Sequence, residues 1–225
     1  MEVHVHENPG AVARAASDRI GALVSDGDSR LSLGLAGGST PKATYRALCE
    51  WDKGWDRVDA WLSDERWVPH DDALSNGRMA TETLLNHVDA TFHRPEWGAE
   101  MAPADSASRY EAQLREIHGE RRPDVIILGM GADGHTASLF PETDALGESA
   151  RWFVSNDVPR LGQHRLTATY PLLQSARLIM VLTVGLDKAL AVKASFEGHT
   201  PAGRLGDGEA DVEWHTDHEA ASLLS

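Results

Sequence analysis

The sequence predicts an α/β fold in which helices cover both faces of a mainly parallel central sheet. Two observations lead to this prediction. Segments with the apolar spacing of helices alternate along the chain with short apolar segments, a rhythm typical of parallel sheets. The segment LIMVLTV, residues 178–184, is almost wholly apolar, as a strand covered on both faces should be. We expect one domain over residues 1–225.

The predicted helices carry apolar residues three and four positions apart. The first covers residues 8–27, where Asn8 can cap the helix and Pro9 suits its first turn. The second follows two glycines, and Ser39 or Thr40 can cap it. Further helices are expected over residues 75–88, 104–119 and 186–198. Strands are expected over residues 30–38, 58–69, 124–131, 151–156, 165–170, 177–184 and 211–217.

The chain is acidic, because 35 Asp and Glu residues outnumber 21 Lys and Arg residues and give a formal net charge of −14. A surface of this sign disfavours nucleic acids and anionic membranes as partners. The single cysteine, Cys49, excludes an intrachain disulfide. The N-terminal MEVHVHENPG lacks the apolar stretch of a signal peptide, and no apolar run approaches the roughly 18 residues of a membrane span. We therefore expect a soluble cytoplasmic protein.

Ligands of open parallel sheets bind at the carboxyl ends of the strands, and the first strand end that carries chemistry reads LAGGSTP. Gly37 and Gly38 let the backbone approach a ligand, and the unpaired amides of the following helix favour an anion. The hydroxyl groups of Ser39 and Thr40 add donors. An ordinary capped turn fits this stretch equally well. The stretch is not a P-loop, and Pro41 replaces the last glycine of a nucleophile elbow.

The second strand end reads LSDERWVP and places Asp64, Glu65 and Arg66 between apolar residues. An isolated cluster of charges is most often a solvated loop with a local ion pair. The position at a predicted strand end favours a functional site instead.

The third strand end, DVIILGMGADGH, contains Gly129, Gly131 and Gly134 in a G-x-G-x-x-G pattern. In a dinucleotide site such glycines open a long helix, with an acidic residue about 20 positions further on. Asp157 stands near that distance, but Pro141 limits any helix from HTASLF to a short one. We therefore disfavour the dinucleotide interpretation.

The same loop contains Asp133 and His135, an arrangement typical of a general base and the residue that orients it. A structural Asp beside an exposed His is the simpler alternative, and a metal site lacks a third ligand nearby. His4 and His6 alternate on a strand and are expected at the surface. His215, in WHTDH with His218, is only a weak metal signal.

Two cations late in the chain are further candidates. Arg165 precedes the strand LTATY, and Lys188 begins the helix after VLTVGLD. Arg offers a forked donor to a phosphate and Lys offers a point charge. Most single basic residues are surface residues that contribute only to solubility.

Five sequence blocks follow one another along the chain: GLAGGSTP, LSDERWVP, GMGADGHTASLFP, RLTATYPLL and VGLDKA. They occur in the order and approximate spacing of the 6-phosphogluconolactonases, and the chain resembles that family over nearly its full length. The resemblance implies a Rossmann-like fold of the sugar-phosphate isomerase and lactonase type. It also implies hydrolysis of 6-phospho-D-glucono-1,5-lactone in the oxidative branch of the pentose phosphate pathway, without a metal or an organic cofactor.

The resemblance also implies a role for each candidate residue. His135 would activate water, Asp133 would orient His135, and Arg66 would stabilise the lactone oxygen or bind substrate. The remaining candidates would bind the substrate and its phosphate: Gly37, Gly38, Ser39, Thr40, Asp64, Arg165 and Lys188. The only partner implied is the small sugar-phosphate lactone, and we expect a monomer or a weak homodimer.

Two alternative functions remain: a related enzyme, the glucosamine-6-phosphate deaminase, and a protein without catalytic activity, a sugar-phosphate sensor. The chain is similar to glucosamine-6-phosphate deaminases in its Gly-Gly-Ser-Thr and Asp-Gly-His loops, and in such an enzyme Asp64 would abstract a proton. The deaminases resemble DEY where this chain has Asp64, Glu65 and Arg66, and they carry a Glu-Pro pair where it has Phe140-Pro141. A sugar-phosphate sensor of the same fold would usually be fused to a DNA-binding module, for which we expect no segment here.

Overall fold

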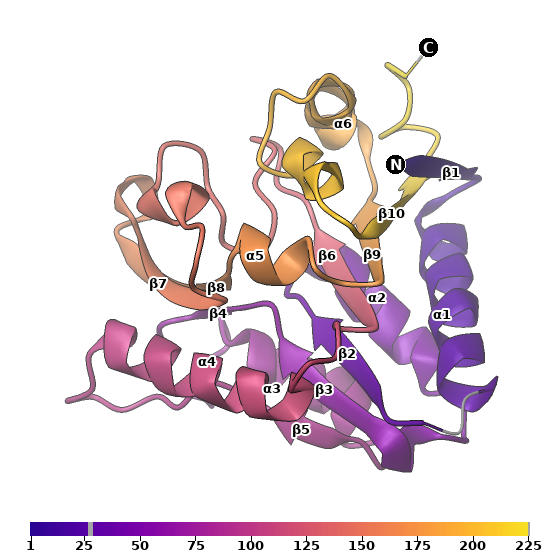
Figure 1. Ribbon diagram of the computed structural model, residues 1–225. Helices are drawn as coiled ribbons and strands as arrows, with labels where there is room; N and C mark the ends of the chain where they lie inside the picture. The colour runs from indigo at the N-terminus through magenta and orange to yellow at the C-terminus, as the bar shows by residue number, and fades with distance from the viewer. Residues whose placement is uncertain (27–28, 225) are drawn as a thin grey trace.

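The computed structural model describes residues 1–26 and 29–224, and its centre is a seven-stranded sheet (Figure 1). The strand order is β1-β10-β9-β6-β2-β3-β5, and all neighbouring strands are parallel. The strands are β1 (Glu2–His6), β2 (Leu31–Leu35), β3 (Val58–Leu62), β5 (Thr91–His93), β6 (Val125–Gly129), β9 (Leu178–Thr183) and β10 (Asp211–Asp217). The predicted mainly parallel sheet is confirmed.

Helices cover both faces of this sheet, as the apolar strands predict. The helices are α1 (Pro9–Asp26), α2 (Ser39–Leu48), α3 (Asn76–Ala80), α4 (Pro103–His118), α5 (Tyr170–Leu173) and α6 (Ala189–Phe196). In β6, Val125 and Ile127 pack into the core that contains α1 and α2, whereas Ile126 and Leu128 pack into the core that contains α4 and α6. Successive side chains of a strand point to opposite faces, so both faces of β6 are buried.

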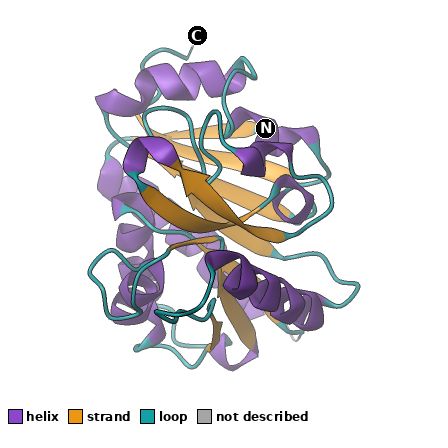
Figure 2. Cartoon of the chain, turned by 90° about the vertical axis from the view of Figure 1, so that its left-hand side faces the viewer, coloured by secondary structure: helices purple, strands orange, loops and turns teal. Residues whose placement is uncertain are grey.

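The segment predicted as one strand over residues 58–69 is two strands in two different sheets. After β3, the strand β4 (Asp64–Arg66) joins a small antiparallel sheet with β8 (Gln163–Ala168) and β7 (Phe153–Val158). Ser63 connects the sheets, because its N–H donates to Leu35 and its carbonyl accepts from Ala168. The small sheet faces the viewer in Figure 2, and it turns β4 toward the carboxyl edge of the large sheet.

Several local predictions differ in detail. Asn8 does cap α1, since its Oδ1 accepts from the Ala11 amide at 3.0 Å. The segment HTASLF, where Pro141 permits only a short helix, is a turn with isolated bridges at Thr136, and Ala137 has a φ of 47°. The helix expected over 75–88 continues from α3 into a π-helix, Thr81–Leu85. Short 3-10 turns occupy Trp55–Arg57, Asp144–Gly147, Pro159–Leu161, Leu186–Lys188 and Gly203–Asp207.

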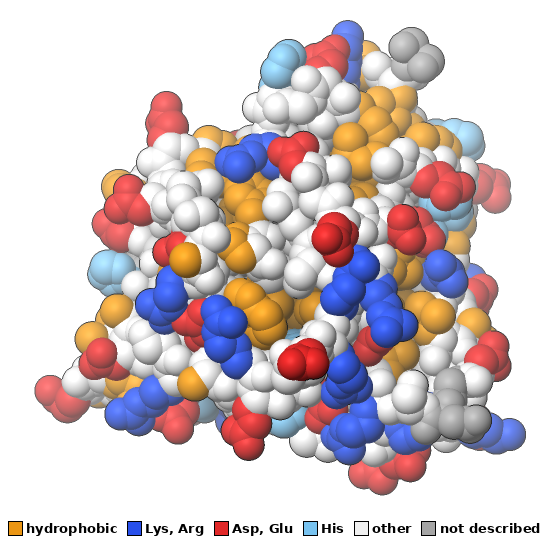
Figure 3. Space-filling view, in the orientation of Figure 1, with side chains coloured by type: hydrophobic (Ala, Val, Ile, Leu, Met, Phe, Trp, Pro, Cys, Tyr) orange, Lys and Arg blue, Asp and Glu red, His pale blue; other side chains and the backbone are white. Residues whose placement is uncertain are grey.

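Acidic and basic side chains lie next to one another on the face of the molecule drawn in Figure 3. The acidic excess of the chain is therefore interspersed with cations on this face. Among the described residues, no helix is long and apolar enough to cross a membrane.

Candidate active site

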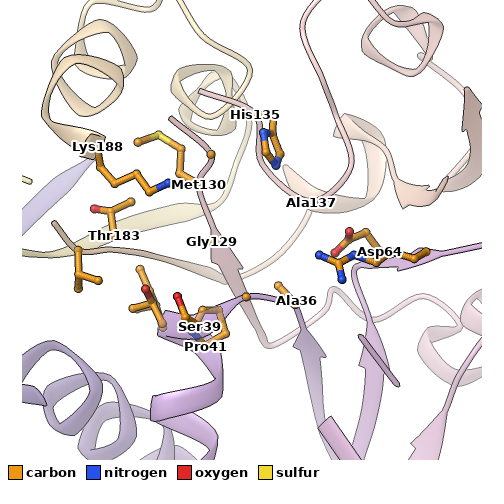
Figure 4. A pocket seen from close by; sticks show the side chains of 17 residues that line it. Ala36, Ser39, Pro41, Asp64, Gly129, Met130, His135, Ala137, Thr183 and Lys188 are labelled. Carbon is orange, nitrogen blue, oxygen red and sulfur yellow. The ribbon is translucent and has the colours of Figure 1, made fainter. Parts of the chain in front are cut away.

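A cleft of about 200 Å³ lies where the loops after β2, β6 and β9 meet beside β4 (Figure 4). The carboxyl ends of parallel strands share one edge of the sheet, which explains why these distant segments meet. Eight of the ten predicted site residues line the cleft: Gly37, Gly38, Ser39, Thr40, Asp64, Arg66, His135 and Lys188. Asp133 contacts His135, and Arg165 lies opposite Arg66 in the small sheet.

The predicted anion-binding loop, Gly37 to Thr40, does not use its hydroxyl groups to cap helix α2. Helix α2 begins at Ser39 with Gly38 as its N-terminal cap, and no side chain caps it. The prediction that Ser39 or Thr40 caps α2 is therefore wrong, because both residues are already inside the helix. Gly38 has a φ of 113°, a conformation that favours glycine. The first amides of α2 thus keep the donor capacity that binds an anion.

Gly37 is required for a different reason. A Cβ atom at this position would lie 1.9 Å from Oδ1 of Asn76. The Asn76 side chain donates to the Asp64 carbonyl at 2.9 Å and is buried. A side chain at position 37 would therefore displace the residue that holds α3 against β4.

His135 is held in one orientation by two contacts. Its Nδ1 lies 2.5 Å from Oδ1 of Asp133, and its ring stacks on Phe140 with 4.0 Å between centroids. A carboxylate can only accept, so Nδ1 carries the proton and Nε2 is left as the basic nitrogen. Arg160 forms an ion pair with the other oxygen of Asp133 and lies over the Phe140 ring.

Burial lowers the pKa of His135 to about 4. The carboxylate of Asp64 opposes this shift, whereas nearby cations reinforce it. These cations are Lys188, Arg165 and Arg66. The imidazole is therefore neutral near pH 7 and can accept a proton.

Two arginines lie side by side on neighbouring strands of the small sheet. Arg66 of β4 and Arg165 of β8 are register partners, and the Nε of each is buried without a hydrogen-bond partner among the described residues. Burial and then the neighbouring Arg66 lower the pKa of Arg165, while Asp64 and Glu65 oppose the shift. An oxygen-rich ligand would satisfy such donors.

Two carboxylates flank this arginine pair. Asp64 is buried and accepts from the hydroxyl of Ser138 at 2.7 Å. Glu65 is buried as well and accepts from the amides of Asn76 and Gly77 at 2.7 and 2.8 Å. Burial raises the pKa of Glu65, and its hydrogen bonds oppose that shift. Glu65 thus fixes the start of α3 against β4, and it forms no ion pair with any residue that the structure describes.

The sequence did not predict three contacts of the site. They are the hydrogen bond from Ser138 to Asp64, the ion pair of Arg160 with Asp133, and the stacking of Phe140 on His135. Phe140 lies within the SLFP block, so only its role was missed. Arg160 contacts Asp133 across 27 positions, and no local pattern marks it.

Lys188 lies on the wall of the cleft opposite His135 (Figure 4). It follows β9 in the 3-10 turn Leu186–Lys188, and its Nζ lies 3.2 Å from Asp187. The Lys188 side chain is 24% exposed and that of Asp187 is 68% exposed. Solvent screens such an exposed carboxylate strongly, so Lys188 keeps attraction for an anion in the cleft.

The parallel sheet, with a cleft at its carboxyl edge, defines the class of α/β enzymes that act on small molecules. The family model described as "Glucosamine-6-phosphate isomerases/6-phosphogluconolactonase" matches residues 7–214. The chain therefore belongs to this family, and the resemblance stated from the sequence blocks is confirmed.

Known relatives agree with this assignment. A 6-phosphogluconolactonase of Rhizobium meliloti is 36% identical over 196 residues, which cover 83% of each chain. The solved 6-phosphogluconolactonase of Trypanosoma cruzi is 27% identical with a TM-score of 0.88, over 100% of this chain and 97% of that one. A monomeric glucosamine-6-phosphate deaminase is 25% identical with a TM-score of 0.84, over 99% and 100% of the two chains.

Proposed function

We propose that the chain hydrolyses 6-phospho-D-glucono-1,5-lactone to 6-phospho-D-gluconate, a step of the oxidative pentose phosphate pathway. The observation that carries this proposal is the placement of a neutral, oriented His135 across the cleft from the start of α2. In Figure 4, Ser39 and Lys188 lie on one side of the cleft, and His135 and Asp64 lie on the other. A base and an anion site on opposite walls suit a substrate with a reactive ring and a remote phosphate.

In the proposed reaction, Nε2 of His135 removes a proton from water as the water oxygen attacks the lactone carbonyl carbon. The carbonyl electron pair moves to oxygen and forms a tetrahedral oxyanion. Collapse of this intermediate breaks the bond to the ring oxygen, which takes the proton back from His135. Asp133 keeps the proton on Nδ1 throughout. A positioned base of this kind is typically worth roughly 10²–10⁴-fold in rate.

Arg66 is proposed to stabilise the oxyanion or to bind the ground-state substrate, because it lines the cleft and presents a buried donor without a partner among the described residues. A fixed donor at a developing oxyanion contributes roughly 3–4 kcal/mol in comparable enzymes. A lactone is an activated ester, so no covalent nucleophile is needed. Arg165 and Asp64 are proposed to bind the substrate beside Arg66 in the small sheet.

The phosphate is proposed to bind at the start of α2. Gly37, Gly38, Ser39 and Thr40 would surround it with amides and hydroxyls, and Lys188 would supply the opposing charge. Because the phosphate is remote from the bond that breaks, this contact positions the lactone rather than activating it. The cations of the cleft also offset the net charge of −14, which repels an anion at long range.

The test is a hydrolysis assay with freshly prepared lactone, followed by NMR at about pH 6, where the spontaneous reaction is slow and His135 is still neutral. We expect rapid opening of 6-phospho-D-glucono-1,5-lactone and slower opening of the unphosphorylated lactone. Ammonia release from glucosamine 6-phosphate, without faster lactone hydrolysis, would instead identify a deaminase. Specific binding of sugar phosphates without any turnover would identify a sensor.

We also propose that the enzyme acts in the cytoplasm as a monomer or a weak homodimer. The single cysteine, Cys49, fits a reducing compartment, where intrachain disulfides are rare. Size-exclusion chromatography with light scattering over a range of concentrations tests the oligomeric state.

A further inference from the structure

Three histidines from the two ends of the chain meet on one face of the sheet. His4 and His6 alternate along β1, and His215 follows Glu213 with the same spacing on β10. The parallel register places His4 opposite His215. Since residues two apart in a strand share a face, the four side chains form one cluster, which we call the β1–β10 cluster. None of them lines the catalytic cleft.

The geometry of the cluster is that of a metal-binding site. One ligand atom each of His4, Glu213 and His215 can be chosen so that all three lie within 4.8 Å of one another. Nε2 of His215 lies 3.4 Å from Oε2 of Glu213, and the His4 and His215 rings stack at 4.9 Å between centroids. The side chains of His4, Glu213 and His215 are 35%, 15% and 6% exposed. The site is therefore sheltered at its base and reached from solvent on the His4 side.

A second set of contacts holds these groups in place. Arg19 of α1 donates to Oε1 of Glu213 at 3.1 Å, which leaves Oε2 on the His215 side. His6 Nε2 lies 3.1 Å from His215 Nδ1. If Nδ1 donates its proton to His6, Nε2 of His215 is an unprotonated ligand. Partners of this kind orient metal ligands and tune their affinity.

We propose that His4, Glu213 and His215 bind a divalent transition metal ion, with Zn²⁺ as the best match, and that the ion fastens the edge strand β1 to β10. Two imidazoles and one carboxylate are a known Zn²⁺ set, completed by water. In the ion-free cluster, Nε2 of His215 lies 3.4 Å from Oε2 of Glu213, and the metal ion would lie between these two atoms. The proposed role is structural and is independent of the proposed lactone chemistry.

His4 and His6 lie at the surface as predicted, and both are only partly exposed. The weak metal signal in WHTDH pairs His215 with His218, but the structure groups His215 with other residues. His215 joins His4 from the other end of the chain, whereas His218 is exposed and lies outside the cluster.

The test is calorimetric titration of Zn²⁺ into the metal-free full-length chain. We expect one strongly bound ion per chain, and we expect His4→Gln to weaken binding at least about tenfold, as loss of a ligand or its support does. His199→Gln is the matched control, because His199 also lies 3.5 Å from a glutamate, Glu197, but is 71% exposed and outside the cluster. This control should bind Zn²⁺ like the wild type.

Two further measurements keep the result interpretable. Excess Zn²⁺ at about 100 times its Kd should raise the Tm of the wild type by roughly 5–10 °C, and of His4→Gln much less. His135→Ala should retain the bound ion, which separates the cluster from the catalytic cleft. Glu213→Gln, tested for a wild-type far-UV spectrum, provides a second ligand deletion if His4→Gln folds poorly.

The proposal is overturned if the wild type binds no Zn²⁺. It is overturned equally if the cluster variants bind Zn²⁺ as tightly as the wild type and His199→Gln do. It is also overturned if His135→Ala abolishes binding, because the ion would then belong to the cleft. Co²⁺ absorption bands from nitrogen and oxygen ligands that persist in His4→Gln would contradict the assignment equally.

Discussion

His135 in the cleft and His215 at the β1–β10 edge have similar immediate partners and different surroundings. His135 Nδ1 lies 2.5 Å from Asp133, and His215 Nε2 lies 3.4 Å from Glu213. Burial is the largest cause that lowers the pKa of each to about 4. A low pKa and a carboxylate partner therefore do not by themselves define what a histidine does.

The neighbours make the difference. Cations surround His135 and strengthen the shift in its pKa, so an anion is drawn to the same place; they are Lys188, Arg165 and Arg66. His215 is flanked by the histidines His4 and His6, which are bases that attract a metal ion. Among the described residues, Nε2 of His135 has no hydrogen-bond partner, whereas both ring nitrogens of His215 contact another side chain. The first arrangement suits proton transfer, and the second suits ligation.

Substitution His135→Ala tests the catalytic side of this comparison and should have the largest effect. We expect kcat to fall by roughly 10²-fold or more, because the general base is lost, while substrate binding stays near that of the wild type. Single-turnover kinetics with the phosphorylated lactone measure the change. An unchanged kcat would remove His135 from the mechanism, and His199→Gln, outside the cleft, should behave like the wild type.

Lys188→Ala should weaken the binding of the phosphorylated substrate by roughly 10- to 100-fold, the usual worth of a charge-assisted contact. The rate of unphosphorylated lactone opening should change little, since that substrate lacks the anion. Lys193→Ala is the matched control, because Lys193 is exposed on α6 and outside the cleft. If Lys188→Ala affected both lactones equally, the phosphate assignment would be wrong.

The variant His6→Gln tests the metal-binding side of the comparison, at the β1–β10 cluster. His6 contacts Nδ1 of His215 but is not one of the three proposed ligands. Loss of such an orienting partner should weaken Zn²⁺ binding by about tenfold and leave lactone hydrolysis unchanged. A variant that loses all Zn²⁺ binding would make His6 itself a ligand, and a variant with wild-type affinity would exclude the orienting role.

The parts of the site predicted from the sequence are those encoded by neighbouring residues. LAGGSTP and GMGADGH each combine a strand end, glycines and polar side chains in one short stretch, so local physics places them at the sheet edge. The parallel sheet is predictable for a similar reason, because the apolar runs of β6 and β9 require cover on both faces.

The parts that were missed depend on contacts between distant segments. Arg66 meets Arg165 only because Ser63 passes the chain from the large sheet to the small one, and a run of strand-like residues does not reveal such a change. His6 and His215 are 209 positions apart. Alternating histidines mark β1 and a single histidine lies in β10, but nothing in either strand indicates that the first and last strands pair.

The pH dependence of hydrolysis is the smallest expected effect and the sharpest test of the surroundings of His135. With a pKa of about 4, the imidazole stays neutral as the pH falls from 7 to 5, so kcat/KM should decline by only about a tenth. A histidine with the ordinary pKa of about 6.5 would lose more than about 90% of its basic form over the same range. The sign follows from the role, because a base works only when unprotonated. A steep fall centred near pH 6.5 would show that burial and the neighbouring cations do not set the pKa of His135.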